Sequence, residues 1–176
     1  MDIRILRYHN VYGPEGTYKG GREKSPAALC RKVAEASNPG EITIWGDGKQ
    51  TRSYCYIDDA VEATIKLMES DYNKPINIGS DRLVTIDELV NIIIKISGKN
   101  ITKTYDPTAP QGVRGRNADL TLVKKILNWK PQTTLEEGLT KNLQMDRNQS
   151  KRRQKPRSNP PSETHTKTPS LSSIYL

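Results

Sequence analysis

Three stretches of the sequence combine glycine with charged side chains, as loops that bind anions often do. They are residues 13–24, ending in Arg22-Glu23-Lys24, residues 45–52, ending in Gln50-Thr51-Arg52, and residues 106–117, ending in Arg114-Gly115-Arg116-Asn117. Glycine lets the backbone approach a ligand closely, and the planar guanidinium of arginine pairs well with phosphate oxygens. If these loops converge in the fold, they form a diphosphate site. Each loop alone is more simply read as a charged surface turn.

The other reactive side chains do not form a recognisable catalytic arrangement. The only histidines are His9 and His165, and a lone histidine near a strand end is usually packed or hydrogen-bonded. The pair Asp58-Asp59 lies at an expected helix start, where helix capping explains it better than acid/base chemistry. Two cysteines are too few for a disulfide framework or a four-ligand zinc site, so no metal site is expected.

Composition and hydropathy exclude several classes of protein. A chain of 176 residues is long enough for one ordinary domain, and 34% of its residues are hydrophobic, with no Phe. No run has the length and apolarity of a membrane span, and the N-terminus lacks the apolar core of a signal peptide. We therefore expect a cytoplasmic protein without membrane contacts.

The net charge of +8 is concentrated towards the C-terminus. Residues 143–176 contain seven Lys/Arg against two acidic residues, so they carry five of the eight net charges. This segment is rich in Ser, Thr, Pro and Asn, and it has too little apolar character to offset the entropy cost of ordering. We expect a disordered basic tail over residues 143–176. Loose binding of RNA through this tail is an alternative function, less favoured than a simple solvated tail.

The elements that must position the three loops alternate between short strand patterns and amphipathic helices over residues 1–142, which predicts an α/β fold. Strands are expected over residues 3–12, 42–44, 53–57, 75–79 and 101–105. Helices are expected to begin at Ser25-Pro26, at Asp58, at the capping box of residues 85–88, near residue 120 and at the capping box of residues 134–137.

Two features of these elements bear on the architecture. The second helix carries two apolar stripes, which predicts that most of its surface is covered by protein; the stripes are Val61, Ile65 and Met68, and Ala60, Ala63 and Leu67. The chain also begins within a strand and contains too few βα units for a complete parallel sheet. We therefore expect the second half of a larger fold, with exposed sheet edges and poor stability when alone.

Five segments in combination resemble the extended short-chain dehydrogenases/reductases, the NAD-dependent nucleotide-sugar epimerases and dehydratases. They are residues 7–14, 45–53, 56–63, 77–79 and 127–131. The resemblance covers about residues 1–142. It implies the C-terminal part of a Rossmann-type NAD(P)-binding fold, namely its final strands and a helix, joined to the small α/β substrate-binding domain, with the N-terminal cofactor half missing.

Within this family, residues 20–28 and 112–117 are most similar to the GDP-mannose 3,5-epimerase branch; UDP-glucuronate decarboxylases and sugar 4,6-dehydratases are the alternatives. The resemblance implies that NAD oxidises the sugar at C4, that an acid/base pair exchanges the C3 and C5 protons, and that the hydride then returns. It implies an acid/base role for Lys24 and contacts with the nucleotide-diphosphate sugar from Asn10, Glu23, Lys24, Lys32, Gln50, Thr51, Arg52 and Arg116. Arg52 and Arg116 are the strongest candidates for diphosphate contacts.

Two family motifs are not found in this sequence. It contains neither the glycine-rich turn that binds the cofactor pyrophosphate nor a Tyr-x-x-x-Lys pair. No cofactor-binding residue is therefore assigned, and we expect the chain to be inactive alone. It would then act as part of an epimerase, or as a non-catalytic binding or dimerisation module that pairs with itself or with an intact paralogue.

Overall fold

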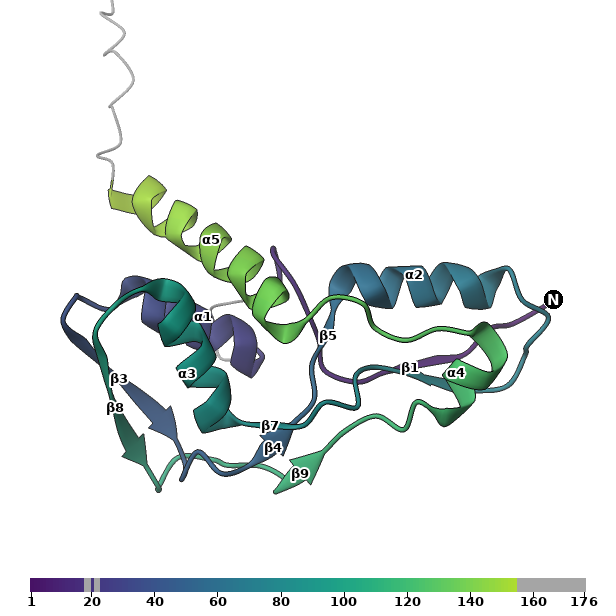
Figure 1. Cartoon of the computed structure of the whole chain (residues 1–176), viewed down its shortest axis with the longest axis horizontal. Coiled ribbons are helices and arrows are strands. Elements are labelled where there is room, and N and C mark those ends of the chain that lie inside the picture. The colour runs from purple at the N-terminus through teal and green to yellow at the C-terminus, as the bar shows by residue number, and fades with distance from the viewer. Residues whose placement is uncertain (18–19, 21–22, 155–176) are drawn as a thin grey trace, which may run out of the picture.

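A computed structural model describes residues 1–17, 20 and 23–154, with the backbone alone for residues 147–154. Arg22 of the first predicted loop, His165 and most of the predicted tail lie outside the described residues. The described chain forms an elongated α/β arrangement with a hydrophobic cluster at each end (Figure 1). The prediction of an α/β fold is therefore confirmed.

The larger end of the molecule packs three helices against a pair of parallel strands. The helices are α1 (Ser25–Glu35), α3 (Ile86–Ser97) and α5 (Leu135–Gln154), and the strands are β3 (Gly40–Trp45) and β8 (Ile101–Asp106). In β3, Ile42 and Ile44 are buried while their neighbours are exposed, as expected for a strand with one covered face. Their side chains join Leu89, Ile93 and Leu139 in one core cluster.

The smaller end is built around a second parallel pair, β1 (Leu6–Tyr8) with β6 (Ile76–Ile78). Helix α2 (Ile57–Met68) and helix α4 (Thr121–Leu127) complete this end. Leu67, Ile76, Ile78 and Val123 are fully buried there, together with Trp129. This cluster shares no buried residue with the first, so each end has its own core.

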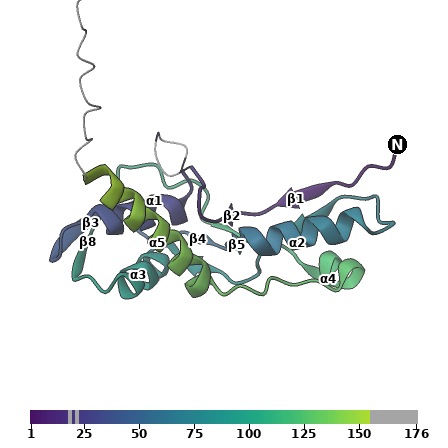
Figure 2. The same cartoon turned by 90° about the horizontal axis from the view of Figure 1, so that it is seen from above.

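Short strands connect the two ends. Strand β2 (Val11–Tyr12) pairs in parallel with β5 (Cys55–Tyr56), and β4 (Thr51–Arg52) lies between β7 (Val84–Thr85) and β9 (Gly115–Arg116). The chain therefore crosses the middle of the molecule several times (Figures 1 and 2). Two of the three predicted anion loops end in strands of this middle region, at Arg52 and at Arg116.

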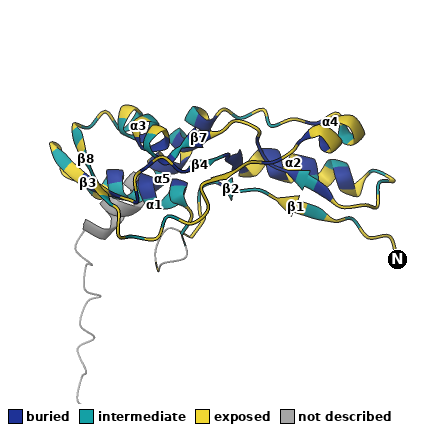
Figure 3. Ribbon diagram, turned by 90° about the horizontal axis from the view of Figure 1, so that it is seen from below, coloured by how far each residue is buried: buried dark blue, intermediate teal, exposed yellow. Residues whose placement is uncertain are grey.

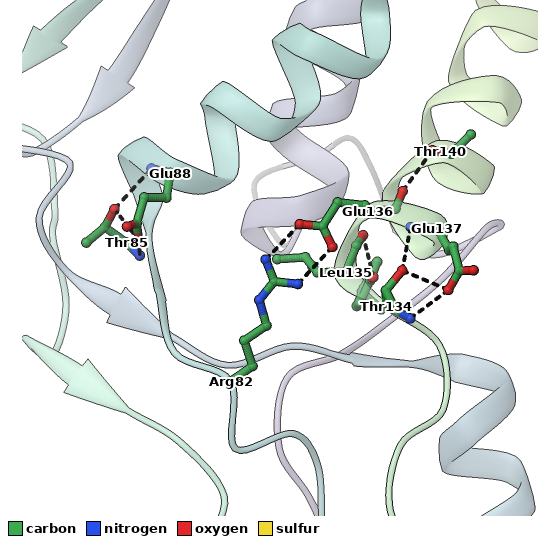
Figure 4. Close-up of polar contacts among 9 residues, drawn as sticks. Arg82, Thr85, Glu88, Thr134, Leu135, Glu136, Glu137 and Thr140 are labelled. Atoms are coloured by element: carbon green, nitrogen blue, oxygen red, sulfur yellow. Dashed lines mark hydrogen bonds and ion pairs between the residues drawn. The ribbon is translucent and has the colours of Figure 1, made fainter.

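Both predicted capping boxes are confirmed and begin helices α3 and α5 (Figure 4). Thr85 accepts a hydrogen bond from the backbone N–H of Glu88, and the Glu88 carboxylate accepts one from the backbone of Thr85. Thr134 and Glu137 repeat this arrangement. Beside the second box, Arg82 forms a two-pronged ion pair with Glu136, with N–O distances of 2.8 and 2.7 Å.

Two helices do not begin with the predicted N-cap residues, Ser25 for α1 and Asp58 for α2. Helix α1 begins at Ser25 with Lys24 as its N-cap, and the Ser25 hydroxyl instead lies 2.9 Å from that of Tyr54. Helix α2 has Tyr56 as its N-cap, with Asp58 inside the first turn. The neighbouring Asp59 is buried because its carboxylate accepts hydrogen bonds from two backbone N–H groups of the segment that leads into α5.

Two predicted strands and the predicted burial of one helix are also corrected. The strand expected over residues 3–12 is split into β1 and β2 because Asn10 adopts a left-handed backbone conformation with φ of 45°. The strand expected over residues 53–57 is reduced to β5, Cys55–Tyr56, and Ile57 already begins α2. On α2, one apolar stripe is buried, but Val61, Ile65 and Met68 are 49%, 49% and 65% exposed (Figure 3).

The C-terminal helix extends into the segment predicted as a tail. Helix α5 continues to Gln154, and Leu143 is buried in the first core cluster. Residues 143–154 are therefore helical, and Leu139 and Leu143 pack this helix into the first core. The prediction of a disordered tail stays untested for residues 155–176. No helix in the described ranges is both long and apolar enough to cross a membrane.

Candidate functional site

One cavity of about 290 Å³ receives residues from all three predicted anion loops. It lies between the N-terminal half of α1, the end of β3 and the loop that follows β8. Its lining consists of Glu23, Ser25, Ala28, Leu29, Arg31, Lys32, Trp45, Gln50, Arg52, Ile86, Pro110 and Gln111. The sequence did not determine whether the three loops meet; in the structure, residues from all three line one cavity.

The second and third loops are held together by polar contacts. Arg114 forms an ion pair with Asp47 at 2.9 Å, and the backbone N–H of Thr51 donates to the carbonyl of Arg114 at 2.9 Å. This ion pair and a backbone hydrogen bond from Lys49 lower the pKa of the Asp47 carboxyl. The two loops thus form one wall of the cavity.

Gly46 allows the close approach of these loops. Its φ is 78°, and a Cβ atom placed there would lie 2.4 Å from Cγ of Gln111. A larger residue at this position would be strained and would also displace Gln111. Glycine is therefore required by both the backbone conformation and the packing of the third loop.

Arg52 and Arg116 are paired residues on adjacent parallel strands, β4 and β9. Paired residues in neighbouring strands project from the same face of a sheet, so two guanidinium groups share this face. Arg52 is half-buried and lines the cavity, where its Nη1 donates to the carbonyl of Thr51 at 2.7 Å. Arg116 is exposed and lies outside the lining.

Gln50 brings a buried polar group to the cavity wall. Its side chain is 6% exposed, and its Nε2 donates to the carbonyl of Trp45 at 3.3 Å. Its Oε1 is buried and accepts no hydrogen bond from any described protein atom. Because a buried acceptor without a partner is unfavourable, this oxygen is suited to accept a hydrogen bond from a ligand.

Lys32 places a positive charge beside an aromatic ring. Its Nζ donates to the carbonyl of Thr43 at 2.7 Å and lies 5.6 Å from the ring centroid of Trp45. Burial and the nearby Arg31 lower the pKa of Lys32, and Glu23 partly opposes this shift. Glu23 itself pairs with Arg31 at 3.4 Å.

Lys24, the predicted acid/base residue, is not part of the lining. It is exposed at the N-cap of α1, where its carbonyl accepts a hydrogen bond from Ala28. Its neighbours in sequence, Glu23 and Ser25, do line the cavity. The backbone of Lys24 thus lies between two lining residues, and its side chain is outside the lining.

Asn10 lies away from the cavity and stabilises the backbone. Its Nδ2 donates to the carbonyl of Ser53 at 3.0 Å, and its own carbonyl accepts a hydrogen bond from Cys55. Thr51, in the middle strand β4, also lies outside the lining. The structure therefore brings together four of the predicted residues, Glu23, Lys32, Gln50 and Arg52, and leaves Asn10, Lys24, Thr51 and Arg116 outside.

Several lining residues were not predicted as site residues. Trp45 is 57% exposed, and Pro110 and Gln111 belong to the third loop. In the sequence, a tryptophan directly before a Gly-x-Gly turn could have indicated Trp45 as a site residue, whereas nothing distinguished Gln111. No group of three or more metal-ligating side chains occurs in the described part of the chain.

Comparison with known protein families gives a match over the N-terminal part of the chain. Residues 1–79 match the NAD dependent epimerase/dehydratase family. GDP-mannose 3,5-epimerase 1 of Oryza sativa subsp. indica is 47% identical over 139 residues, which is 79% of this chain and 36% of that protein. UDP-glucuronic acid decarboxylase 1 of Arabidopsis thaliana is 34% identical over 148 residues, 84% of this chain and 33% of that protein.

Solved structures show the same relationship. UDP-glucose 4-epimerase of Thermotoga maritima, solved with UDP-glucose, superposes with a TM-score of 0.76 at 33% identity and covers 84% of this chain. UDP-glucuronic acid 4-epimerase of Bacillus cereus, solved with UDP-glucuronic acid and NAD, gives a TM-score of 0.73 at 30% identity over 85% of this chain. This chain spans about a third of the curated relatives and 46% of each of these solved chains.

Proposed function

Because residues 1–79 match the NAD dependent epimerase/dehydratase family, we propose that this chain supplies the nucleotide-sugar-binding part of an epimerase resembling GDP-mannose 3,5-epimerase. The observation that carries this proposal is the convergence of three glycine- and charge-rich loops on one cavity. The higher identity to GDP-mannose 3,5-epimerase than to UDP-glucuronic acid decarboxylase, 47% against 34%, favours the first as the substrate class.

The cavity offers complementary groups for the parts of a nucleotide-diphosphate sugar. Arg52 presents a planar cation for the diphosphate, and Lys32 adds a second positive charge. Gln50 provides a buried acceptor for a ligand hydroxyl or amine. Apolar contacts come from Leu29 and Ile86. Charge would hold the diphosphate in this arrangement, and hydrogen bonding and apolar contact would hold the rest of the ligand.

The helix at the cavity also favours an anion. In α1, the first turn contains no acidic residue, whereas α2, α3 and α5 each carry two. The N-terminus of a helix attracts negative charge, and carboxylates in the first turn would oppose an anionic ligand. The N-terminus of α1 is therefore better suited to a diphosphate than those of α2, α3 and α5.

The family depends on NAD, but the residues of this chain do not form a complete NAD site. The sequence has no glycine-rich pyrophosphate turn, and the first turn of α2, which follows strand β5, carries Asp58 and Asp59. These carboxylates disfavour a pyrophosphate at that helix. We therefore assign to this chain the binding of the nucleotide sugar and one proton-handling group, and no step that NAD carries out.

That proton-handling group is Lys24. It is the N-cap residue of α1, and its neighbours in sequence, Glu23 and Ser25, line the cavity. From there it is proposed to donate or accept a proton at a sugar carbon of the bound ligand. A binding module without catalysis would use the same cavity without this step.

Trp45 provides a direct test of binding. The chain has two tryptophans, and Trp129 is only 2% exposed in the second core, so a ligand in the cavity should alter Trp45 fluorescence selectively. Titration of the full chain with GDP-mannose should give a saturable change, and Arg52→Met should raise the dissociation constant by at least about tenfold.

Arg114→Met is the matched control, because Arg114 belongs to the third loop but pairs with Asp47 outside the cavity lining. It should leave the affinity within about threefold of the original value. Equal losses in both variants, or no saturable response to GDP-mannose in the original chain, would overturn the proposal.

A further inference from the structure

The hydroxyl of Ser25 is turned away from the usual task of a serine at a helix start. A serine there commonly accepts a hydrogen bond from a backbone N–H of the first turn. In this chain Lys24 is the N-cap and Ser25 is the first residue of α1, and the Ser25 hydroxyl lies 2.9 Å from that of Tyr54. Because Ser25 also lines the cavity of the candidate site, this pair of hydroxyls joins the cavity wall to a distant part of the sequence.

Tyr54 is held in place by the core behind it. It is buried in the first core cluster, where its ring packs edge-on against that of Tyr12 with the centroids 6.2 Å apart. Burial raises the pKa of the Tyr54 hydroxyl, and the hydrogen bond with Ser25 and the charge of Arg52 only partly oppose this rise. Tyr54 therefore keeps its proton at neutral pH and can donate it to the Ser25 oxygen.

The direction of this hydrogen bond decides what Ser25 offers to the cavity. A hydroxyl carries one hydrogen and two lone pairs, and either oxygen of the Ser25–Tyr54 pair can be the donor. If Tyr54 donates, the Ser25 hydrogen stays free to point at a ligand. A ligand acceptor in the cavity selects this direction, because only then do both hydroxyl hydrogens have an acceptor.

The surroundings of Ser25 favour a phosphate oxygen as that acceptor. Arg52 lines the same cavity, and the first turn of α1 contains no acidic residue. The buried Oε1 of Gln50, which has no partner among the described protein atoms, also points to a ligand in this cavity. Pro26, the second residue of α1, has no backbone N–H, so this helix start offers an anion one donor fewer than usual. The Ser25 hydroxyl can supply the missing donor.

We propose that Tyr54 and Ser25 form a hydrogen-bond relay to the diphosphate of the bound nucleotide sugar, in which Ser25 contacts the ligand and Tyr54 is a positioning residue. Tyr54 donates to the Ser25 oxygen, and Ser25 donates to a phosphate oxygen. Each hydrogen bond in such a chain polarises the next, so Tyr54 strengthens the contact without touching the ligand. This inference rests on the proposed function and adds a neutral donor to the cavity that Arg52 lines.

Titration of the full chain with GDP-mannose and with GDP tests the relay. Ser25→Ala should raise the dissociation constants of both ligands about tenfold, because it removes a hydrogen bond to a charged oxygen. Tyr54→Phe should raise both about threefold, but it should have no further effect in the Ser25→Ala chain, since its contribution passes through Ser25. A merely structural role of Tyr54 would persist in that chain.

Tyr8→Phe is the matched control, because the Tyr8 hydroxyl lies 2.8 Å from that of Thr64 and neither residue lines the cavity. It should leave both affinities unchanged, and circular dichroism of each variant verifies that the helices are retained.

The outcomes separate the relay from the proposed function. The relay is overturned if Ser25→Ala leaves the affinity for GDP within about twofold, or if Tyr54→Phe weakens binding further in the Ser25→Ala chain. A loss confined to GDP-mannose would place the contact at the sugar and would also overturn it. Binding that Arg52→Met weakens and Ser25→Ala does not would refute the relay alone, whereas an original chain that binds neither ligand would refute the proposed function as well.

Discussion

At the scale of single residues, the cavity depends on groups that lower the stability of the fold. Gln50 keeps a buried oxygen without a protein partner, and Gly46 adopts a left-handed conformation to admit Gln111. Such features lower stability, and ligand binding is the purpose that the surrounding loops suggest for them. Both residues therefore offer substitutions that separate stability from binding.

Gln50→Met is expected to weaken binding without unfolding the protein. The substitution removes an unsatisfied buried acceptor and one hydrogen bond to the carbonyl of Trp45, so the free energy of unfolding should change by less than about 1 kcal/mol. The affinity for GDP-mannose should fall by about tenfold. Urea unfolding and fluorescence titration measure the two effects, and parallel losses in both would contradict the assigned role.

Gly46→Ala is expected to destabilise the protein by about 2 kcal/mol, since it adds backbone strain to a clash with Gln111. Gly98→Ala is the matched control: its φ is 67°, but its added Cβ meets no atom within 4 Å, so only the strain of about 1 kcal/mol applies. Combining Gly46→Ala with Gln111→Ala should recover the difference. An equal cost at both glycines would show that the contact with Gln111 contributes nothing.

At the scale of secondary-structure elements, the packing of α5 on α1 buries a carboxyl group. Asp146 of α5 is 4% exposed near Cys30 of α1, with Arg31 and Glu35 of α1 close by. Burial raises the pKa of Asp146 to about 6; Arg31 opposes this rise and Glu35 adds to it. Burial also raises the pKa of the Cys30 thiol. The contact between these helices is therefore sensitive to pH.

The folded protein should hold the Asp146 proton at a pH where the unfolded chain, with an aspartate pKa of about 3.9, has released it. The contribution of Asp146 to stability is thus largest below pH 4 and is lost as the pH rises through 6. Relative to Asp146→Asn, the original chain should lose about 2 kcal/mol between pH 4.5 and 7.5. Urea unfolding at both pH values measures this, and a constant difference would contradict the assignment.

The sequence predicted the positions of the helices better than the long-range contacts and the burial of each element. Hydrophobic spacing and the two Thr–Glu capping boxes were sufficient to locate α3 and the start of α5, because these signals are local. The break at Asn10 depends on hydrogen bonds to Ser53 and Cys55, which lie far away in the sequence. For the same reason the spacing on α2 showed two apolar stripes but not that only one is covered.

The candidate site shows the same division. Glycine and arginine identified the three loops, and four predicted residues meet in one cavity. The positions of Lys24 and Arg116 at its margin follow from where α1 begins and from which residues β4 and β9 pair. Gln111 could not be predicted, since its place depends on a contact with Gly46 across two loops.

At the scale of the whole molecule, the described chain has one hydrophobic cluster at each end, and the two clusters share no buried residue. The stability of each end therefore depends on the contacts of its own core.

The central claim is that this chain binds a nucleotide-diphosphate sugar in the cavity formed by its three loops. The most direct measurement is calorimetric titration of the full chain with GDP-mannose, with UDP-glucuronic acid as the competing ligand class. We expect one saturable site, tighter binding of GDP-mannose, and loss of the heat signal in Arg52→Met but not in Arg114→Met. Absence of a saturable signal with either ligand, or a signal unaffected by Arg52→Met, would contradict it.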